Sequence, residues 1–168
     1  MSTDHAAKEG RSAEEIIAAL QRRWILEGWE KAPGERFVFK DKVGHFYDWS
    51  AEGATYYDTF DPQLRIARSP DEWRDAFEAP FDRMHSALHA VTDEPDVLVR
   101  GETAAATFEF CARLQASDGK VTSTICRTSH VWGLRDGEWR IIREHTSCRL
   151  VSIEELKALL AKREPQKL

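Results

Sequence analysis

The spacing of apolar residues changes character halfway along the chain. In the first half, apolar side chains recur every three or four positions, which predicts amphipathic helices. The predicted helices cover roughly residues 13–32, 39–49 and 70–84. Serine followed three residues later by glutamate is a capping box, a signal for a helix start. Three such boxes occur, at Ser12, Ser69 and Ser152. Pro33-Gly34 ends the first helix, and Pro80 is expected to kink the third.

After about residue 85 the period changes to two, which is typical of strands. Strand patterns then follow over 87–91, 97–99, 103–115, 121–134 and 139–150. One short strand, over 54–58, is predicted earlier, between the second and third helices. Asp118-Gly119 and Asp136-Gly137 are expected to be hairpin turns, because glycine supplies the positive φ that such turns need. Helices followed by an antiparallel meander predict an α+β domain with helices on one face of a sheet.

The 168 residues fit one domain, and their composition narrows its partners. We expect a flexible N-terminus over 1–11, a folded domain over 12–150, and a C-terminal helix and tail over 151–168. The 29 acidic and 24 basic residues give a net charge of −5, which disfavours nucleic acid and membranes as partners. With no secretory leader and no CxxC pair among the three cysteines, we expect a cytoplasmic protein with reduced thiols.

The last two predicted strands resemble a known family. The segment VWGLRDGEWRIIREHTS, residues 131–147, is similar to the closing hairpin of SnoaL-like domains in the nuclear transport factor 2-like superfamily. The association domain of calcium/calmodulin-dependent kinases has a similar hairpin. The resemblance covers roughly 12–150. It implies a cone-shaped, strongly curved antiparallel sheet wrapped around N-terminal helices. The superfamily includes ketosteroid isomerase, polyketide cyclases, dehydratases and structural hubs, so only the site can decide function.

Asp58 is the first catalytic candidate. It ends the predicted strand over 54–58, next to Tyr57 and Phe60. Its Ala-Thr-x-x-Asp setting resembles the place where ketosteroid isomerase carries its general base. Aromatic surroundings disfavour a charged carboxylate and raise its pKa towards the range that suits proton transfer. The alternative is an ordinary turn aspartate ahead of Asp61-Pro62.

His130 and His145 are the other catalytic candidates, as acid, base or oxyanion donor. A two-residue turn at 136–137 would pair His130 with Arg143 and place both histidines on one face, with Glu109 close enough to orient either. A three-residue turn would place His130 opposite Ile142 and the histidines on opposite faces. The alternative for His145 is a structural role, because the His-x-Ser ending also occurs in non-catalytic hubs.

The remaining candidates would bind a ligand. They are Tyr47, Trp49, Tyr57, Glu109, Arg127 and Arg143. The arginines suit an acidic or enolate ligand if they point inwards, and are surface charge if they do not. The aromatic residues would line a pocket or pack in the core. His85 and His89 have the spacing of a helical metal pair but no third ligand, so we expect no metal and no cofactor.

Together these features favour a cofactor-free enzyme that performs acid–base chemistry of the isomerase, cyclase or dehydratase type. Its ligand would be a small hydrophobic or weakly acidic molecule, and its outer sheet face would form a homodimer. The alternative is a non-catalytic module of the same fold that binds a small molecule or only dimerises. An enzyme needs Asp58 and a histidine at the same cavity.

Overall fold

The computed structural model describes residues 10–161, so the predictions for residues 1–9 and 162–168 lie outside the described residues. The helical elements are α1 (Ala13–Arg23), a π-helical turn η1 (Trp24–Gly28), α2 (Phe39–Lys42), a 3₁₀ turn η2 (Gly44–Phe46), α3 (Pro70–Asp82) and α4 (Ile153–Ala161). The strands are β1 (Thr55–Asp58), β2 (Met84–Arg100), β3 (Thr103–Ala116), β4 (Val121–Arg135) and β5 (Glu138–Val151). The predicted α+β organisation is confirmed.

The helix starts follow the predicted serines. Ser12 Oγ accepts from the Glu15 amide at 3.2 Å, and Glu15 accepts in return from the Ser12 amide at 2.8 Å. The predicted first helix is less regular than its pattern, because its last turn widens into η1. The predicted second helix is only α2 followed by η2, since Gly44 is a poor helix former.

The five strands form one sheet in the order β1-β5-β4-β3-β2. All neighbours are antiparallel except β1, which runs parallel to β5. The two predicted strands over 87–91 and 97–99 are one strand, β2, with register shifts between Val91 and Asp96. The apolar face predicted for β3 is buried. It consists of Ala104, Ala106, Phe108, Phe110, Ala112 and Leu114.

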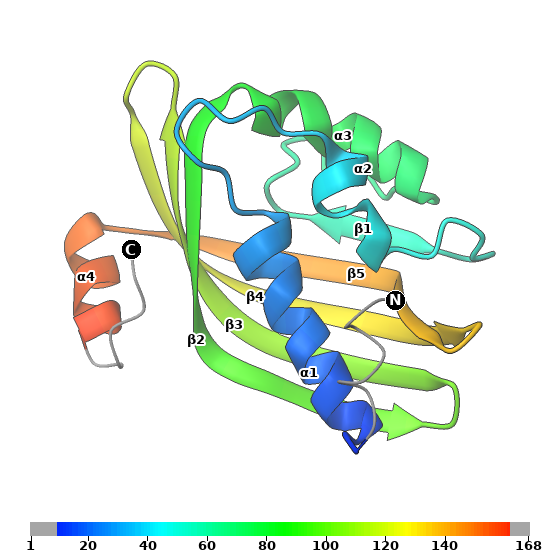
Figure 1. The fold of residues 1–168 in the computed structure, drawn as a ribbon. Coiled ribbons are helices and arrows are strands. Elements are labelled where there is room, and N and C mark those ends of the chain that lie inside the picture. The colour runs from blue at the N-terminus through cyan, green and yellow to red at the C-terminus, as the bar shows by residue number, and fades with distance from the viewer. Residues whose placement is uncertain (1–9, 162–168) are drawn as a thin grey trace, which may run out of the picture.

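The helices divide unequally between the two faces of the sheet (Figure 1). α1 crosses the inner face, and α3 lies beyond β1 at the same side, so these elements enclose the main core with the sheet. α4 covers part of the outer face, where Leu156 packs with Ala90 and Cys111. The strong curl that the resemblance implies is not seen: the sheet bends across α1 without closing around it.

The turn between β4 and β5 has two residues, the first of the two alternatives that the sequence left open. Asp136 and Gly137 both have positive φ, 50° and 77°, which is the geometry of a type I′ turn. Leu134 pairs with Trp139 directly beside it. The prediction of a hairpin turn at this Asp-Gly pair is therefore confirmed.

The register of a two-residue turn holds as far as Trp132–Ile141, but neither predicted partner of His130 occurs. Trp132 pairs with Ile141 and Val131 with Arg143, so Ile142 has no partner and forms a β-bulge. One extra residue reverses the faces of everything that follows it on β5. His130 therefore lies opposite Glu144, and Ser129 lies opposite His145.

Candidate active site

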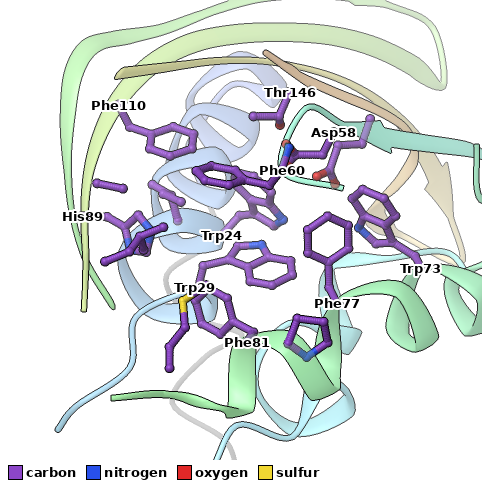
Figure 2. Close-up of a pocket in the computed structure, with 16 residues that line it drawn as sticks. Trp24, Trp29, Asp58, Phe60, Trp73, Phe77, Phe81, His89, Phe110 and Thr146 are labelled. Carbon is purple, nitrogen blue, oxygen red and sulfur yellow. The ribbon is translucent and has the colours of Figure 1, made fainter. Parts of the chain in front are cut away.

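A cavity of about 110 Å³ lies between η1, α3 and the inner face of the sheet (Figure 2). Its walls are mainly aromatic rings from the helices, the sheet and the loop after β1. They are Trp24, Trp29, Phe60, Trp73, Phe77, Phe81 and Phe110. Polar lining side chains come from three strands. They are Asp58, His89, Glu144 and Thr146. This combination of apolar walls and few polar groups is typical of small-molecule sites.

Asp58 enters the cavity from the end of β1, where it pairs with Thr146 of β5. Its Oδ1 accepts from the Phe60 amide at 2.7 Å. Burial raises the pKa of Asp58 to about 7, the Phe60 amide opposes that rise, and the negative charges of Glu144 and Asp61 add to it. Near neutral pH both forms of this carboxyl are populated, so it can take a proton from a ligand or return one.

Glu144 is the second carboxyl at the cavity, and it is only 3% exposed. Tyr47 donates its hydroxyl hydrogen to Glu144 Oε2 at 2.6 Å. The indole nitrogens of Trp24 and Trp73 donate to Tyr47 Oη at 3.1 and 3.3 Å. Burial and the negative charge of Glu144 raise the pKa of Tyr47 well above its usual value, so Tyr47 stays a neutral donor.

His130 lies behind Glu144 and is 1% exposed. Its Nε2 is 3.3 Å from Glu144 Oε2, a distance that suits an ion pair although the two groups are poorly aligned for a hydrogen bond. Its Nδ1 is 2.9 Å from Gln21 Oε1, which also accepts from Trp132 Nε1 at 3.1 Å. A polar chain therefore runs from α1 through His130 to the cavity carboxyl.

The structure brings three of the sequence candidates to this side of the sheet. Asp58 lines the cavity, and Tyr47 and His130 contact it through Glu144. The enzyme hypothesis requires Asp58 and a candidate histidine at the same cavity, and neither His130 nor His145 lines it: His130 reaches the cavity only through Glu144. Their catalytic roles remain a prediction.

Five other candidates lie on the outer face of the sheet, away from the cavity. His145 stacks on Tyr57 with ring centroids 4.3 Å apart. Arg127 pairs with Glu109 at 3.0 Å and its side chain is 82% exposed. Arg143 is also exposed. The bulge at Ile142 explains the separation of the histidines, because it turns His145 outwards and Glu144 inwards.

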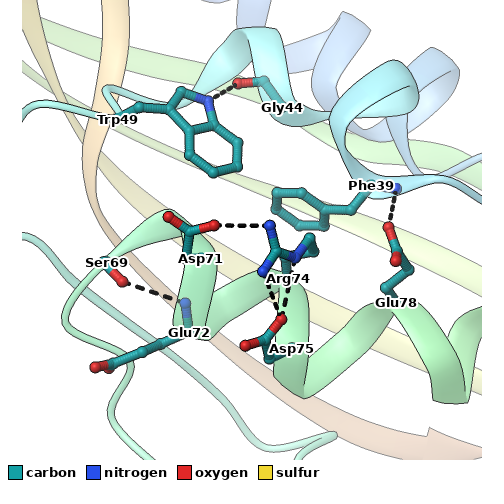
Figure 3. Close-up of polar contacts among 9 residues, drawn as sticks. All are labelled: Phe39, Gly44, Trp49, Ser69, Asp71, Glu72, Arg74, Asp75 and Glu78. Atoms are coloured by element: carbon teal, nitrogen blue, oxygen red, sulfur yellow. Dashed lines mark hydrogen bonds and ion pairs between the residues drawn. The ribbon is translucent and has the colours of Figure 1, made fainter.

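Trp49 lies outside the cavity as well, beside α2 (Figure 3). Its indole nitrogen donates to the Gly44 carbonyl at 2.8 Å, and Lys40 Nζ lies 5.0 Å from the ring centroid. The ring packs against Phe39 at its edge. These contacts hold the exposed Trp49 side chain against α2.

Glu144 is the main residue that sequence reasoning missed. Its face depends on the bulge, and the only local signal is the pair Ile141-Ile142, which breaks the alternation of apolar and polar residues. The cavity aromatics on η1 and α3 have helical spacing, which predicts core packing equally well. The sequence pattern suggests His89 only as a metal ligand, yet its side chain lines the cavity from β2.

Among residues 10–161, no group of three or more His, Cys, Asp or Glu side chains has the arrangement of a metal site. His85 and His89 lie on β2, so the helical spacing that suggested a metal pair does not apply. Within the same range, no helix combines the length and apolar character that a membrane crossing requires.

Comparison with known proteins agrees with this fold. A model of the SnoaL-like domain matches residues 41–151. A nuclear transport factor 2-like superfamily protein from Salmonella enterica is 16% identical, with a TM-score of 0.63 over 80% of this chain and 89% of that one. A putative calcium/calmodulin-dependent protein kinase II association domain from Xanthomonas campestris is 20% identical, with a TM-score of 0.60 over 84% and 91%.

A putative aromatic ring hydroxylase from Novosphingobium aromaticivorans is 14% identical, with a TM-score of 0.60 over 82% of this chain and 91% of that one. At such identities the likeness establishes the fold alone. No curated protein matches the sequence.

Proposed function

The chain belongs to the SnoaL-like family, and we propose that it is a cofactor-free enzyme that moves protons on a small ring compound, with Asp58 as the base. The observation that carries the proposal is a carboxyl group with a pKa of about 7 in the wall of an aromatic cavity. Proton transfer is most efficient when the pKa of the catalytic group is near the working pH. An isomerase, cyclase or dehydratase reaction would use such a group.

The size of the cavity limits the ligand. An engineered apolar cavity of about 150 Å³ holds benzene, so about 110 Å³ suits a single ring and excludes a steroid without rearrangement. Trp29 Nε1 is a buried cavity-wall donor without a hydrogen-bond partner in the described part of the chain. A buried donor without a partner costs free energy, and an acceptor on the ligand would remove that cost. This favours a ring compound that carries an oxygen.

The second candidate function is a non-catalytic module that binds a small molecule or forms a homodimer. The observation that favours it is the outer sheet face, where Tyr57 is 39% exposed and the remaining sequence candidates gather. One similar structure is a putative kinase association domain. In this alternative the cavity binds a small molecule without reaction or is only part of the core.

Proton abstraction can be tested without knowing the natural substrate. Acetophenone and cyclohex-2-enone in D₂O are incubated with the protein, and deuterium at carbon is followed by mass spectrometry. We expect the wild-type protein to accelerate exchange and Asp58→Asn to lower the rate by about 10²- to 10⁴-fold, the usual contribution of a general base. Wild-type exchange no faster than buffer would contradict the proposal.

Two variants control this experiment. His145→Asn alters a histidine on the outer face and should leave the exchange rate unchanged. Ala112→Leu enlarges a cavity-lining side chain and should abolish exchange by occupying the space of the ring. Binding without exchange, measured as a thermal shift, would favour the non-catalytic module instead.

A further inference from the structure

The protons around His130 can be counted from its neighbours. Trp132 Nε1 can only donate, so the Gln21 atom that it meets at 3.1 Å must be the amide oxygen. That same oxygen lies 2.9 Å from His130 Nδ1, which must therefore carry a hydrogen. In a neutral ring the other nitrogen, Nε2, is then a bare acceptor.

The same count applies to Glu144. Tyr47 has one hydroxyl hydrogen and gives it to Glu144 Oε2, because its own oxygen accepts from two indoles. His130 Nε2 lies 3.3 Å from this same Oε2 in a site that is almost fully buried. Two acceptors facing each other there would be costly unless a proton lies on one of them.

We propose that Glu144 is a second acid–base group of the cavity and that Glu144 and His130 carry one proton between them, either as a carboxylate beside an imidazolium or as a carboxylic acid beside a neutral imidazole. The proposal rests on the proposed function, because it places an acid opposite the base Asp58. Glu144 touches the ligand space, whereas His130 acts through Glu144 and is a positioning residue. The other ionisable groups that face Glu144 are Tyr47, Tyr56 and Asp58.

This arrangement defines the ligand as an enolisable ring compound with an oxygen. Asp58 takes a proton from the carbon next to a carbonyl, and the electrons of that C–H bond form the enol double bond. The carbonyl oxygen takes the single proton that Glu144 and His130 carry between them, and Glu144 delivers it. Asp58 has then gained one proton and the pair has lost one, so the reverse transfer at the same or another carbon restores both.

The pair is tested in the ligand-free protein by NMR at neutral pH, with ¹⁵N-labelled histidine and ¹³C-labelled glutamate carboxyls. We expect Nδ1 of His130 to be protonated, and one further proton on Nε2 or on Glu144. A deprotonated Nε2 together with a Glu144 carboxylate would overturn the proposal. Glu144→Gln assigns the signal of Glu144 and should shift the His130 resonances, whereas Glu109→Gln, a carboxyl change on the outer face, should not.

The role of His130 is tested by the pH profile of acetophenone exchange. We expect the rate to rise with ionisation of Asp58 and to fall when the pair loses its proton at higher pH. His130→Gln keeps a polar side chain but cannot hold the proton, so the alkaline fall should disappear. If His130→Gln lowers the exchange rate by the same factor at every pH, the role of His130 is structural. If wild type shows no exchange, the proposed function fails, while the NMR result still decides whether the pair exists.

Discussion

Asp58 and Asp61 are three residues apart and experience opposite electrostatic environments. Burial raises the pKa of Asp58 to about 7, although the Phe60 backbone amide opposes that rise. Asp61 is buried too, but Arg65 donates to both of its oxygens at 2.8 and 3.1 Å and holds the pKa of Asp61 below its usual value. Asp61 also accepts from the backbone amides of Gln63 and Arg65, so a cation and two amides separate its pKa from that of Asp58.

The raised pKa of Asp58 predicts a pH-dependent cost. A carboxyl whose pKa rises from 3.8 in the unfolded chain to about 7 in the fold destabilises the protein progressively between these values. The upper limit is about 4 kcal/mol, at about 1.36 kcal/mol for each pKa unit. Asp58→Asn should therefore raise the melting temperature at pH 8 relative to wild type, with a gain that shrinks towards pH 4. Calorimetry at both pH values measures it.

The matched comparison is Asp61→Asn, which should lower the melting temperature at pH 8 because it removes a favourable charge pair. A stabilising effect of Asp61→Asn, or an effect of Asp58→Asn that does not vary with pH, would contradict this account.

A second prediction concerns the field between the two cavity carboxyls. The negative charge of Glu144 contributes to the raised pKa of Asp58. In Glu144→Gln the pKa of Asp58 should fall, yet stay above its usual value because burial is the larger cause. Carboxyl ¹³C titration of Asp58 measures this shift. An unchanged pKa would mean that Glu144 does not influence Asp58 across the cavity.

At the scale of elements, the π-helical turn η1 determines which side chains reach the cavity. It places Trp24 at its start and Trp29 immediately after its end, and both line the cavity wall. Gly28 lets this turn pack closely on the following segment, because a Cβ there would lie 2.7 Å from Val43 Cγ1. Periodicity correctly predicts a helix here but not its wider last turn, which depends on this contact with distant residues.

Gly28→Ala should destabilise the protein by about 1–3 kcal/mol, the usual cost of overpacking a core. Urea denaturation followed by tryptophan fluorescence measures the loss. Gly133→Ala is the matched control, since its new Cβ would meet Ile142 at 3.4 Å, an ordinary contact. Equal effects of the two substitutions would show that the packing against Val43 is not the cause.

The β4–β5 hairpin shows how far local patterns reach. Asp136-Gly137 predicts the tight turn correctly, because the required positive φ is a property of those two residues. The strand register beyond it is not local. The extra residue, Ile142, lies beside Gly133 of the neighbouring strand. The face of Glu144, and hence half of the candidate site, follows from that bulge.

At the scale of the molecule, α4 is separate from the main core. The main cluster joins α1, η1, α3 and the inner face of the sheet, whereas α4 contributes Leu156 to a small cluster on the outer face. Segments with few buried contacts open at lower free energy than the core. The aromatic cavity should therefore stay intact when α4 detaches.

Leu156→Ala tests this independence. Removing a buried leucine side chain costs about 2–5 kcal/mol. Leu156 is the largest of the three buried residues in the outer cluster, so this loss should detach α4. We expect hydrogen exchange in α4 to accelerate strongly while amides of β3 and β4 keep their protection. Loss of protection throughout the sheet would show that α4 and the core unfold together.

The unpartnered Ile142 has a consequence for how this protein can change in length. A deletion in a regular strand turns every later side chain to the other face. Here the loss of one residue between Trp139 and Ile142 would only remove the bulge, and Glu144 would remain opposite His130. An insertion has no such reserve: it would bring Arg143 opposite His130 and turn Glu144 to the outer face. Length variation at this hairpin should therefore be one-sided: the hairpin can lose one residue, but not gain one, and keep Glu144 opposite His130.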